Sequence, residues 1–315
     1  MMRADVICVG ECMVELNHHR GRYTLQFGGD TFNTAAYMSR AGARVAYATA
    51  VGDDPYSARM LAYFESEKVG THLIPRMRGR VPGLYIIETD AAGERSFSYW
   101  RDNAPARELF EISEANGVLA AMLEAKLIYF SGITLSLYSS AALDVFESAL
   151  HFARLQGARV AFDSNIRPRG WGHDMERARA TFSRFIAHCD IALPTFDDEQ
   201  QLWGDATPDE TFARYAALGV AEVGVKMGAG GVLLSEAGER SHVAIPKIIV
   251  PVDTTAAGDS FNGGYLAARL AGASVERAAL TGHALAGAVI QHKGAIVPKS
   301  TTRAALKALG HPVLR

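Results

Sequence analysis

Short apolar runs rich in β-branched residues alternate along the chain with longer segments in which apolar residues recur every three or four positions. The first pattern is typical of buried strands and the second of amphipathic helices. Their alternation predicts crossover units and a largely parallel sheet, hence an α/β fold. The expected strands are 5–10, 44–51, 127–133, 158–164, 189–194 and 222–227. The expected helices lie near 31–41, 54–69, 139–156, 174–187 and 208–218, and two consecutive helices follow residue 257.

Two regions break this alternation. Residues 83–101 contain two aromatic-rich strands around a glycine-containing turn at 90–94, which predicts a β-hairpin. Residues 15–29 also alternate polar and apolar positions in the manner of strands. We expect both regions to form a small accessory sheet on the main body. Since no linker, repeat or low-complexity run interrupts the chain, the sequence predicts one α/β body with a β flap.

Composition limits the kinds of partner. The chain has 315 residues, of which 49% are hydrophobic and 21% charged, and its net charge is −2 with both signs interspersed. This is ordinary globular composition, with nothing that would attract nucleic acid or an anionic membrane. No apolar run reaches the ~18 residues of a membrane span, and the apolar run at the N-terminus is too short for a signal peptide. We therefore expect a soluble cytoplasmic protein whose cysteines serve as packing residues; these are Cys8, Cys12 and Cys189.

Several common catalytic motifs are missing. The chain contains no G-x4-G-K-[ST] loop, no H-E-x-x-H and no G-x-S-x-G. The first expected strand is followed by "VGECMVE" rather than G-x-G-x-x-G. These absences exclude the simplest P-loop and dinucleotide-binding interpretations.

The segment "VDTTAAGDSF" at 252–261 carries the strongest chemical signal. A helix beginning near Gly258 would leave its first N–H groups unpaired, and together with the helix dipole they would form an anion site. Small residues before the helix would let a phosphoryl group approach the backbone. Asp259, in the first turn, could face a hydroxyl presented to the same site, which suits phosphoryl transfer to an alcohol. The alternative is that Asp253 and Asp259 only cap the helix.

Two further segments could bind a polar ligand. In 27–42, two glycines allow close backbone approach, and Asp30 and Asn33 begin an apolar helix, so the segment is either a capped helix or a site for polyol hydroxyls. In 98–107, Trp100 either walls a binding site or simply covers the sheet. Arg101 needs an anion at this position.

Basic residues follow two of the expected strands. Arg167 and Arg169 come directly after strand 158–164, at the edge where α/β sheets bind ligands. Arg167 is therefore either a ligand-binding residue or part of a surface salt bridge. Lys226 ends another strand and is followed by three glycines within four residues, which indicates either a nucleotide loop or a tight turn.

Taken together, "FGGDTFN", "VKMGAGG" and "DTTAAGDSF" resemble, in this order, the signatures of the ribokinase-like (PfkB) sugar kinases. The resemblance spans nearly the whole chain. It implies a single domain over 1–315 with a three-layer α/β sandwich, a mostly parallel central sheet and a β-sheet lid from about 12–29 and 73–103. It also implies transfer of the γ-phosphoryl group of ATP to a sugar hydroxyl in the presence of Mg²⁺.

The resemblance assigns roles to individual residues. Asp259 is then the base, and the N–H groups of Ala256, Ala257 and Gly258 form the anion hole. The family usually has glycine where this chain has Ala256, so the hole is retained if that position does not need a positive φ. The metal ligands stay open, because the usual Asn-x-x-Glu motif is replaced by "LPTFDDEQQLWG" at 193–204. The nucleotide-binding residues would be Ser164, Asn165, Arg167, Lys226, Gly228, Gly231 and Gly258.

Within this family the chain resembles the branch of bacterial 2-keto-3-deoxygluconate kinases, which implies phosphorylation of the 6-hydroxyl of a sugar acid. Arg101 and Arg167 would clamp the substrate carboxylate. The other expected sugar contacts are Gly29, Asp30, Asn33, Tyr85 and Tyr99. Two alternatives remain, namely a fructokinase-like kinase of a neutral sugar and a non-catalytic sugar- or nucleotide-binding protein. We also expect a homo-oligomer, and the region of Asp253 and 293–295 leaves open a monovalent cation.

Overall fold

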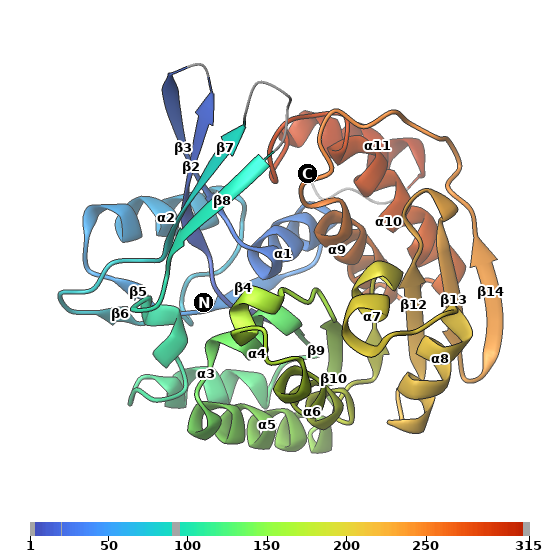
Figure 1. The fold of residues 1–315 in the computed structure, drawn as a ribbon, viewed down its shortest axis with the longest axis horizontal. Coiled ribbons are helices and arrows are strands. Elements are labelled where there is room, and N and C mark those ends of the chain that lie inside the picture. The colour runs from blue at the N-terminus through green and yellow to red at the C-terminus, as the bar shows by residue number, and fades with distance from the viewer. Residues whose placement is uncertain (1–3, 20, 90–94, 311–315) are drawn as a thin grey trace.

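The computed structural model describes residues 4–19, 21–89 and 95–310, so the turn predicted at 90–94 lies outside the described residues. An eight-stranded sheet forms the centre of the molecule, in the order β14-β13-β12-β11-β10-β9-β1-β4 (Figure 1). Strands β4, β1, β9, β10, β11 and β12 run parallel, and β13 and β14 add an antiparallel edge. Their bounds are β1 Val6–Val9, β4 Val45–Ala48, β9 Leu127–Ser131, β10 Arg159–Asp163, β11 Ile191–Ala192, β12 Glu222–Lys226, β13 Val232–Glu236 and β14 Glu239–Val243.

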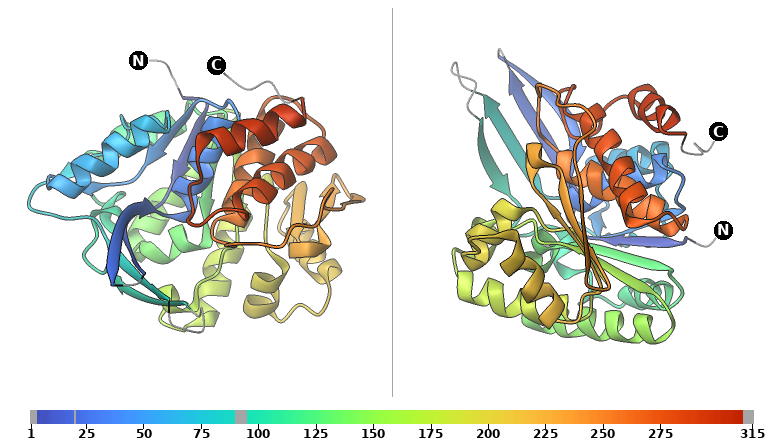
Figure 2. Two further views of the ribbon diagram at one scale, coloured as in Figure 1. Left: turned by 90° about the horizontal axis from the view of Figure 1, so that it is seen from above. Right: turned by 90° about the vertical axis from the view of Figure 1, so that its right-hand side faces the viewer.

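Helices cover both faces of this sheet, which makes three layers. Strand β1 shows why: Val6 and Cys8 pack into one apolar cluster, whereas Ile7 and Val9 pack into another on the opposite face. The first cluster includes residues of α1, α2, α9 and α10, and the second includes residues of α3 to α8. Figure 2 shows helices on both faces of the sheet. The helices are α1 Asp30–Arg40, α2 Pro55–Ser66, α3 Ala115–Met122, α4 Gly132–Leu137, α5 Ser140–Leu155, α6 Met175–Ile186, α7 Phe196–Trp203, α8 Pro208–Ala217, α9 Ala257–Leu270, α10 Val275–Val289 and α11 Lys299–Ala308.

A separate four-stranded sheet projects from the body beside α1 (Figure 1). Its order is β3-β2-β7-β8, with β2 Met13–His19, β3 Arg22–Gly28, β7 Leu84–Thr89 and β8 Arg95–Trp100. The strands β5 Val51–Gly52 and β6 Arg76–Met77 pair with each other in a third sheet. The early part of the predicted 73–103 range therefore does not join the four-stranded sheet.

The predicted α/β architecture is confirmed, including the mostly parallel central sheet and the small second sheet. Every expected strand of the main sheet contains an observed one. Across the described part of the chain, no helix is long and apolar enough to cross a membrane.

Candidate active site

The first turn of α9 presents backbone donors. Ala256, at the N-cap, has φ 59°, and the amide of Ala257 donates to the carbonyl of Thr254 at 3.1 Å. The amides of Ala256 and Gly258 have no acceptor among the residues that the structure describes. Of the three amides predicted to form the anion hole, that of Ala257 is already engaged in the turn that precedes the helix. The free donors at this helix terminus favour an anion.

The anion hole was predicted to be retained if position 256 did not need a positive φ. Ala256 does adopt a positive φ. An alanine in this conformation costs roughly 1–2 kcal/mol, whereas glycine tolerates it. We therefore expect Ala256→Gly to raise the free energy of unfolding by about 0.5–1 kcal/mol with the N–H retained. Urea denaturation checks this, with Ala271→Gly as control, because Ala271 has φ −82° and should be destabilised by glycine. Equal destabilisation of both variants would contradict the strain at Ala256.

Asp259 lies in the first turn of α9, and Asn33 in the first turn of α1 holds its carboxylate. The Asn33 amide donates to Oδ2 of Asp259 at 2.9 Å. Removal of water by the surrounding protein, followed by the negative charge of Asp30, raises the pKa of Asp259 to about 7. The two helix N-termini therefore bring together the two acidic segments that the sequence singled out. A carboxyl group with this pKa is suited to accept a proton near neutral pH.

Asp30 is held from a different strand end. Asn165, which follows β10 and has φ 28°, donates to Oδ2 of Asp30 at 2.7 Å. Burial raises the pKa of Asp30, and the nearby Asp163 carboxylate adds to the effect. Asn165 was expected on the nucleotide side, but its amide is engaged with a residue expected to bind the sugar.

Lys226 is buried at the end of β12 and faces the α9 terminus. Its Nζ donates to Oδ2 of Asp163 at 3.0 Å and to Oδ1 of Asn262 at 3.2 Å. A Cβ atom added at Gly258 would lie 3.5 Å from the same Nζ. The second oxygen of Asp163, Oδ1, is buried without a partner among the described residues. A cation and an unused carboxylate oxygen thus lie next to the free amides.

A cavity of about 350 Å³ opens beside this group. Lys226, Gly228, Gly231 and Gly258 line one part of it, as the nucleotide-loop interpretation requires. Gly231 has φ 87°, and a Cβ atom there would come within 2.4 Å of the Val243 carbonyl oxygen, so glycine is needed. The rest of the lining is largely apolar and suits a flat heterocycle; it includes Ile245, Ile249, Phe261, Ala286 and Ile290.

On the side of the small sheet, Arg101 forms an ion pair with the buried carboxylate of Glu11. Burial raises the pKa of Glu11 despite this guanidinium. Two polar atoms of the pair, Glu11 Oε1 and Arg101 Nε, lack partners in the described part of the chain. The anion that Arg101 was expected to need is therefore supplied by the protein itself in this structure. Sequence reasoning missed Glu11, although a carboxylate directly after a buried strand was a signal.

The two tyrosines of the hairpin lie together. Tyr85 and Tyr99 stack with ring centroids 5.8 Å apart, and the Arg169 guanidinium lies 5.3 Å from the Tyr99 centroid. The Tyr85 hydroxyl donates to the buried carboxylate of Glu15, another residue that the sequence analysis did not select. Tyr85 is thus engaged within the sheet rather than free to donate. Trp100 is 58% exposed, so it does not cover the sheet as a buried residue would.

The remaining expected residues are placed as follows. Arg167 is largely exposed and lies 3.5 Å from Asp198 Oδ1, which is the salt-bridge alternative. Burial raises the pKa of Asp198 to about 6. Glu199 is fully buried against Arg214, so it is unavailable to a metal ion. Ser164, which was predicted to bind the nucleotide, is fully buried. Gly29, which was predicted to contact the sugar, packs so closely that an added Cβ atom would lie 2.1 Å from the Glu11 carbonyl oxygen.

Comparison with known proteins gives consistent results. A family model described as "pfkB family carbohydrate kinase" matches residues 3–302. The 2-dehydro-3-deoxygluconokinase of Dickeya dadantii is 43% identical, with 95% of this chain and 98% of that protein covered. The protein of the same name from Haemophilus influenzae is 38% identical, with 92% and 95% covered.

Two solved structures share the fold. A Thermotoga maritima structure named 2-dehydro-3-deoxygluconokinase has a TM-score of 0.80 at 23% identity, covering 95% of this chain and 98% of that one. An E. coli structure described as a putative Ribokinase II in complex with ATP and Mg²⁺ has a TM-score of 0.83 at 21% identity, covering 97% and 99%.

Proposed function

This chain belongs to the pfkB family of carbohydrate kinases, and on that premise we propose that it phosphorylates the 6-hydroxyl of 2-dehydro-3-deoxygluconate with ATP. The products are the 6-phosphate and ADP. The observation that carries the proposal is the carboxylate of Asp259, held by Asn33 at 2.9 Å beside free amides at a helix N-terminus. Relatives of 38–43% identity that carry the name 2-dehydro-3-deoxygluconokinase support this substrate.

Asp259 accepts the proton of the attacking hydroxyl. Because an alcohol is far less acidic than a carboxylic acid, the proton moves late, once bonding to phosphorus has begun, and Asp259 first orients the hydroxyl. Negative charge on the phosphoryl oxygens is stabilised by the amides of Ala256 and Gly258 and by the ammonium group of Lys226. Asp30 and Asn33 hold the middle hydroxyls of the sugar.

The nucleotide lies in the apolar cavity, with its phosphates directed toward Gly258. The four-stranded sheet acts as a lid that closes over the sugar and excludes water, which limits ATP hydrolysis. This lid role rests on the stacking of Tyr85 on Tyr99 and on the ion pair that joins Arg101, directly after β8, to Glu11.

The residues fit Mg²⁺. The ion usually binds substrate phosphates plus one or two carboxylates, and Asp163 has a buried carboxylate oxygen without a partner in the described residues. Asp163 would hold the ion, with Asp198 beside it. When bound, Mg²⁺ neutralises charge on the phosphates.

A monovalent cation near Asp253 is a further part of the proposal. The Gly294 amide donates to Oδ2 of Asp253 at 2.9 Å, so the segment 293–295 lies against Asp253. Exchange of K⁺ for tetramethylammonium in the assay tests it.

ADP release with Mg·ATP tests the substrate, comparing 2-dehydro-3-deoxygluconate with fructose and ribose in one buffer. A preference for the acid sugar by about 100-fold or more supports the proposal. A preference for a neutral sugar retains the kinase but rejects the substrate. Stabilisation by ligand without ADP release would instead favour a binding protein.

Arg167 gives a clean test of the carboxylate clamp, since its side chain is 58% exposed and its removal should not affect folding. We expect Arg167→Ala to raise KM for the acid sugar about tenfold, because one charge-assisted hydrogen bond is lost. The KM for ATP and the melting temperature of the protein should stay unchanged. Arg184→Ala on helix α6 is the control for KM, since this arginine pairs with Asp144 and Glu147 and its loss should lower only the stability. An unchanged KM for the acid sugar in Arg167→Ala would remove it from the clamp.

The raised pKa of Asp259 predicts a pH dependence. The base must be deprotonated, so activity is present above its pKa of about 7 and is lost as the pH falls below it. We expect kcat/KM to fall about tenfold per pH unit below this value and to level off above it. A pH profile from about 5.5 to 8.5 measures this. A flat profile across the range would contradict the assignment.

We also propose that the protein is a cytoplasmic homo-oligomer. Three large aromatic side chains on the edge strands β3 and β8 are exposed, and a second copy of the chain would cover them; these are Tyr23, Phe97 and Trp100 at 57%, 42% and 58%. Light scattering coupled to size exclusion measures the mass, and a monomer at micromolar concentration would reject this part of the proposal.

A further inference from the structure

A second cavity, of about 390 Å³, lies far from Asp259. It is formed where the last turn of α1, the segment after α2, the start of β4 and the first turn of α11 meet. Helix α1 carries Asp30 and Asn33 at one end and Arg40 at the other, so about 15 Å of helix separates this cavity from the proposed active site. The cavity is therefore a separate feature of the fold.

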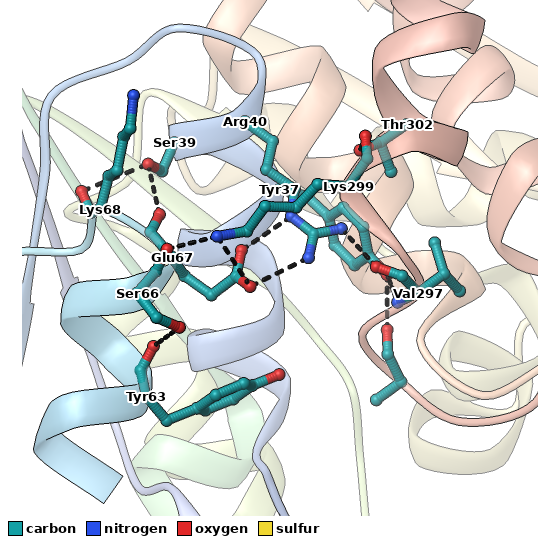
Figure 3. Close-up of polar contacts among 11 residues, drawn as sticks. Tyr37, Ser39, Arg40, Tyr63, Ser66, Glu67, Lys68, Val297, Lys299 and Thr302 are labelled. Carbon is teal, nitrogen blue, oxygen red and sulfur yellow. Dashed lines mark hydrogen bonds and ion pairs between the residues drawn. The ribbon is translucent and has the colours of Figure 1, made fainter.

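A buried ion pair forms one wall of the cavity (Figure 3). Arg40 binds Glu67 through two hydrogen bonds, of 2.8 and 3.1 Å, and donates a third, of 2.7 Å, to the carbonyl of Val297. Lys299 adds its ammonium group 3.5 Å from the same carboxylate. Since Arg40 and Glu67 are both nearly fully buried, the negative charge of Glu67 is neutralised before any ligand arrives.

The charge left on the cavity is positive. Five lining residues are cationic, namely Arg40, Arg44, Lys68, Lys299 and Arg303, and Glu67 is the one carboxylate among the lining residues. Asp5, outside the lining, binds Arg44 at 2.7 and 2.8 Å. Subtracting these two carboxylates from five cations leaves an excess of three positive charges. An enclosed surface with one sign of charge concentrates counter-ions of the opposite sign.

Two of these cations are available to a ligand. The side chains of Lys68 and Arg303 make no hydrogen bond or ion pair with any residue in the described ranges, and the hydrogen bonds of Lys68 are those of its backbone to Ser39 and Glu65. In Figure 3 the Lys68 ammonium points away from the Glu67 carboxylate, although Lys299 reaches toward it. Lys68 also has φ 59°, a conformation that costs a non-glycine residue energy. The two free cations come from different elements of the lining, one from the segment after α2 and one from α11.

We propose that this cavity binds a small phosphorylated molecule. A phosphate group is a dianion near neutral pH and accepts hydrogen bonds from several directions, as cations on separate elements require. A carboxylate carries a single negative charge and would therefore balance less of the excess positive charge than a phosphate dianion does. The cavity volume lies in the range of small-molecule sites, so the ligand is larger than phosphate itself and carries further atoms beyond the phosphate group. This site is independent of the proposed kinase function.

The test counts phosphate sites by equilibrium dialysis of radiolabelled inorganic phosphate at constant ionic strength. The proposed active site also binds phosphate, so the wild-type protein should show two sites. The variant Lys68→Gln/Arg303→Gln should lose the second site or weaken it on the order of 100-fold, because each removed cation contributes about tenfold. Lys307→Gln, an exposed residue of α11 outside the cavity, should behave as wild type.

The outcomes are distinct. All three substituted positions are exposed, so the variants should melt with the wild type. ADP release should also be unchanged, since none of them lies near Asp259. Phosphate binding that Lys68→Gln/Arg303→Gln leaves unchanged in both the number of sites and their affinity would overturn the proposal.

Discussion

Replacing Asp259 with asparagine should lower kcat by about 10³-fold or more. Asparagine has the same shape and can still accept the hydrogen bond from Asn33, so the fold and the α9 terminus should be retained. It cannot accept the proton of the sugar hydroxyl. The Kd for ATP should change little, because the apolar cavity, the amides and Lys226 remain. Steady-state ADP release and calorimetric titration of ATP measure the two quantities.

Asn33→Ala is the matched variant. It removes the residue that positions the carboxylate but leaves the base in place, so we expect a loss of only about tenfold in kcat. It should also shift the pH profile upward, since the Asn33 hydrogen bond lowers the pKa of Asp259. A kcat for Asp259→Asn within tenfold of the wild type would remove Asp259 as the base.

The parts of the fold that the sequence predicted have strong local patterns. Strands such as β1 and β9 are buried on both faces, so they read as short continuous apolar runs. The elements that the sequence did not predict have weak patterns of apolar and polar residues. Helix α7 buries only Glu199 and Leu202, which is too few positions for a helical period to be visible. The edge strand β14 is exposed along most of its length, so no apolar run marks it.

The sequence singled out candidate site residues one at a time, but it could not predict which of them pair. Asn33 and Asp259 are 226 positions apart, and they meet because α1 packs closely on α9. Gly263 permits this approach, since a Cβ atom there would lie 2.6 Å from Tyr37 Cβ. Nothing local to either helix encodes that contact. The same holds for Arg101 and Glu11, whose pairing depends on where the small sheet meets the end of β1.

Of the single substitutions proposed for this protein, Lys226→Met should lower the free energy of unfolding most. Lys226 and Asp163 are both buried, and the substitution leaves the Asp163 carboxylate with only the Asn262 amide, at 2.7 Å, among its described partners. Breaking one side of a buried pair costs about 3–5 kcal/mol, whereas removing both charges can be nearly neutral. We therefore expect a loss of about 3–5 kcal/mol in the free energy of unfolding, measured by urea denaturation.

The double variant Lys226→Met/Asp163→Asn separates stability from catalysis. It removes both charges and keeps a side chain of similar shape at 163, so most of the lost stability should return. Turnover should stay at least about 100-fold low, because the phosphoryl oxygens have lost the cation beside the Gly258 amide and the proposed Mg²⁺ site has lost the Asp163 carboxylate. If the double variant regained both stability and turnover, Lys226 would be a structural partner of Asp163 only. If Lys226→Met were as stable as the wild type, the pair would contribute nothing to the fold.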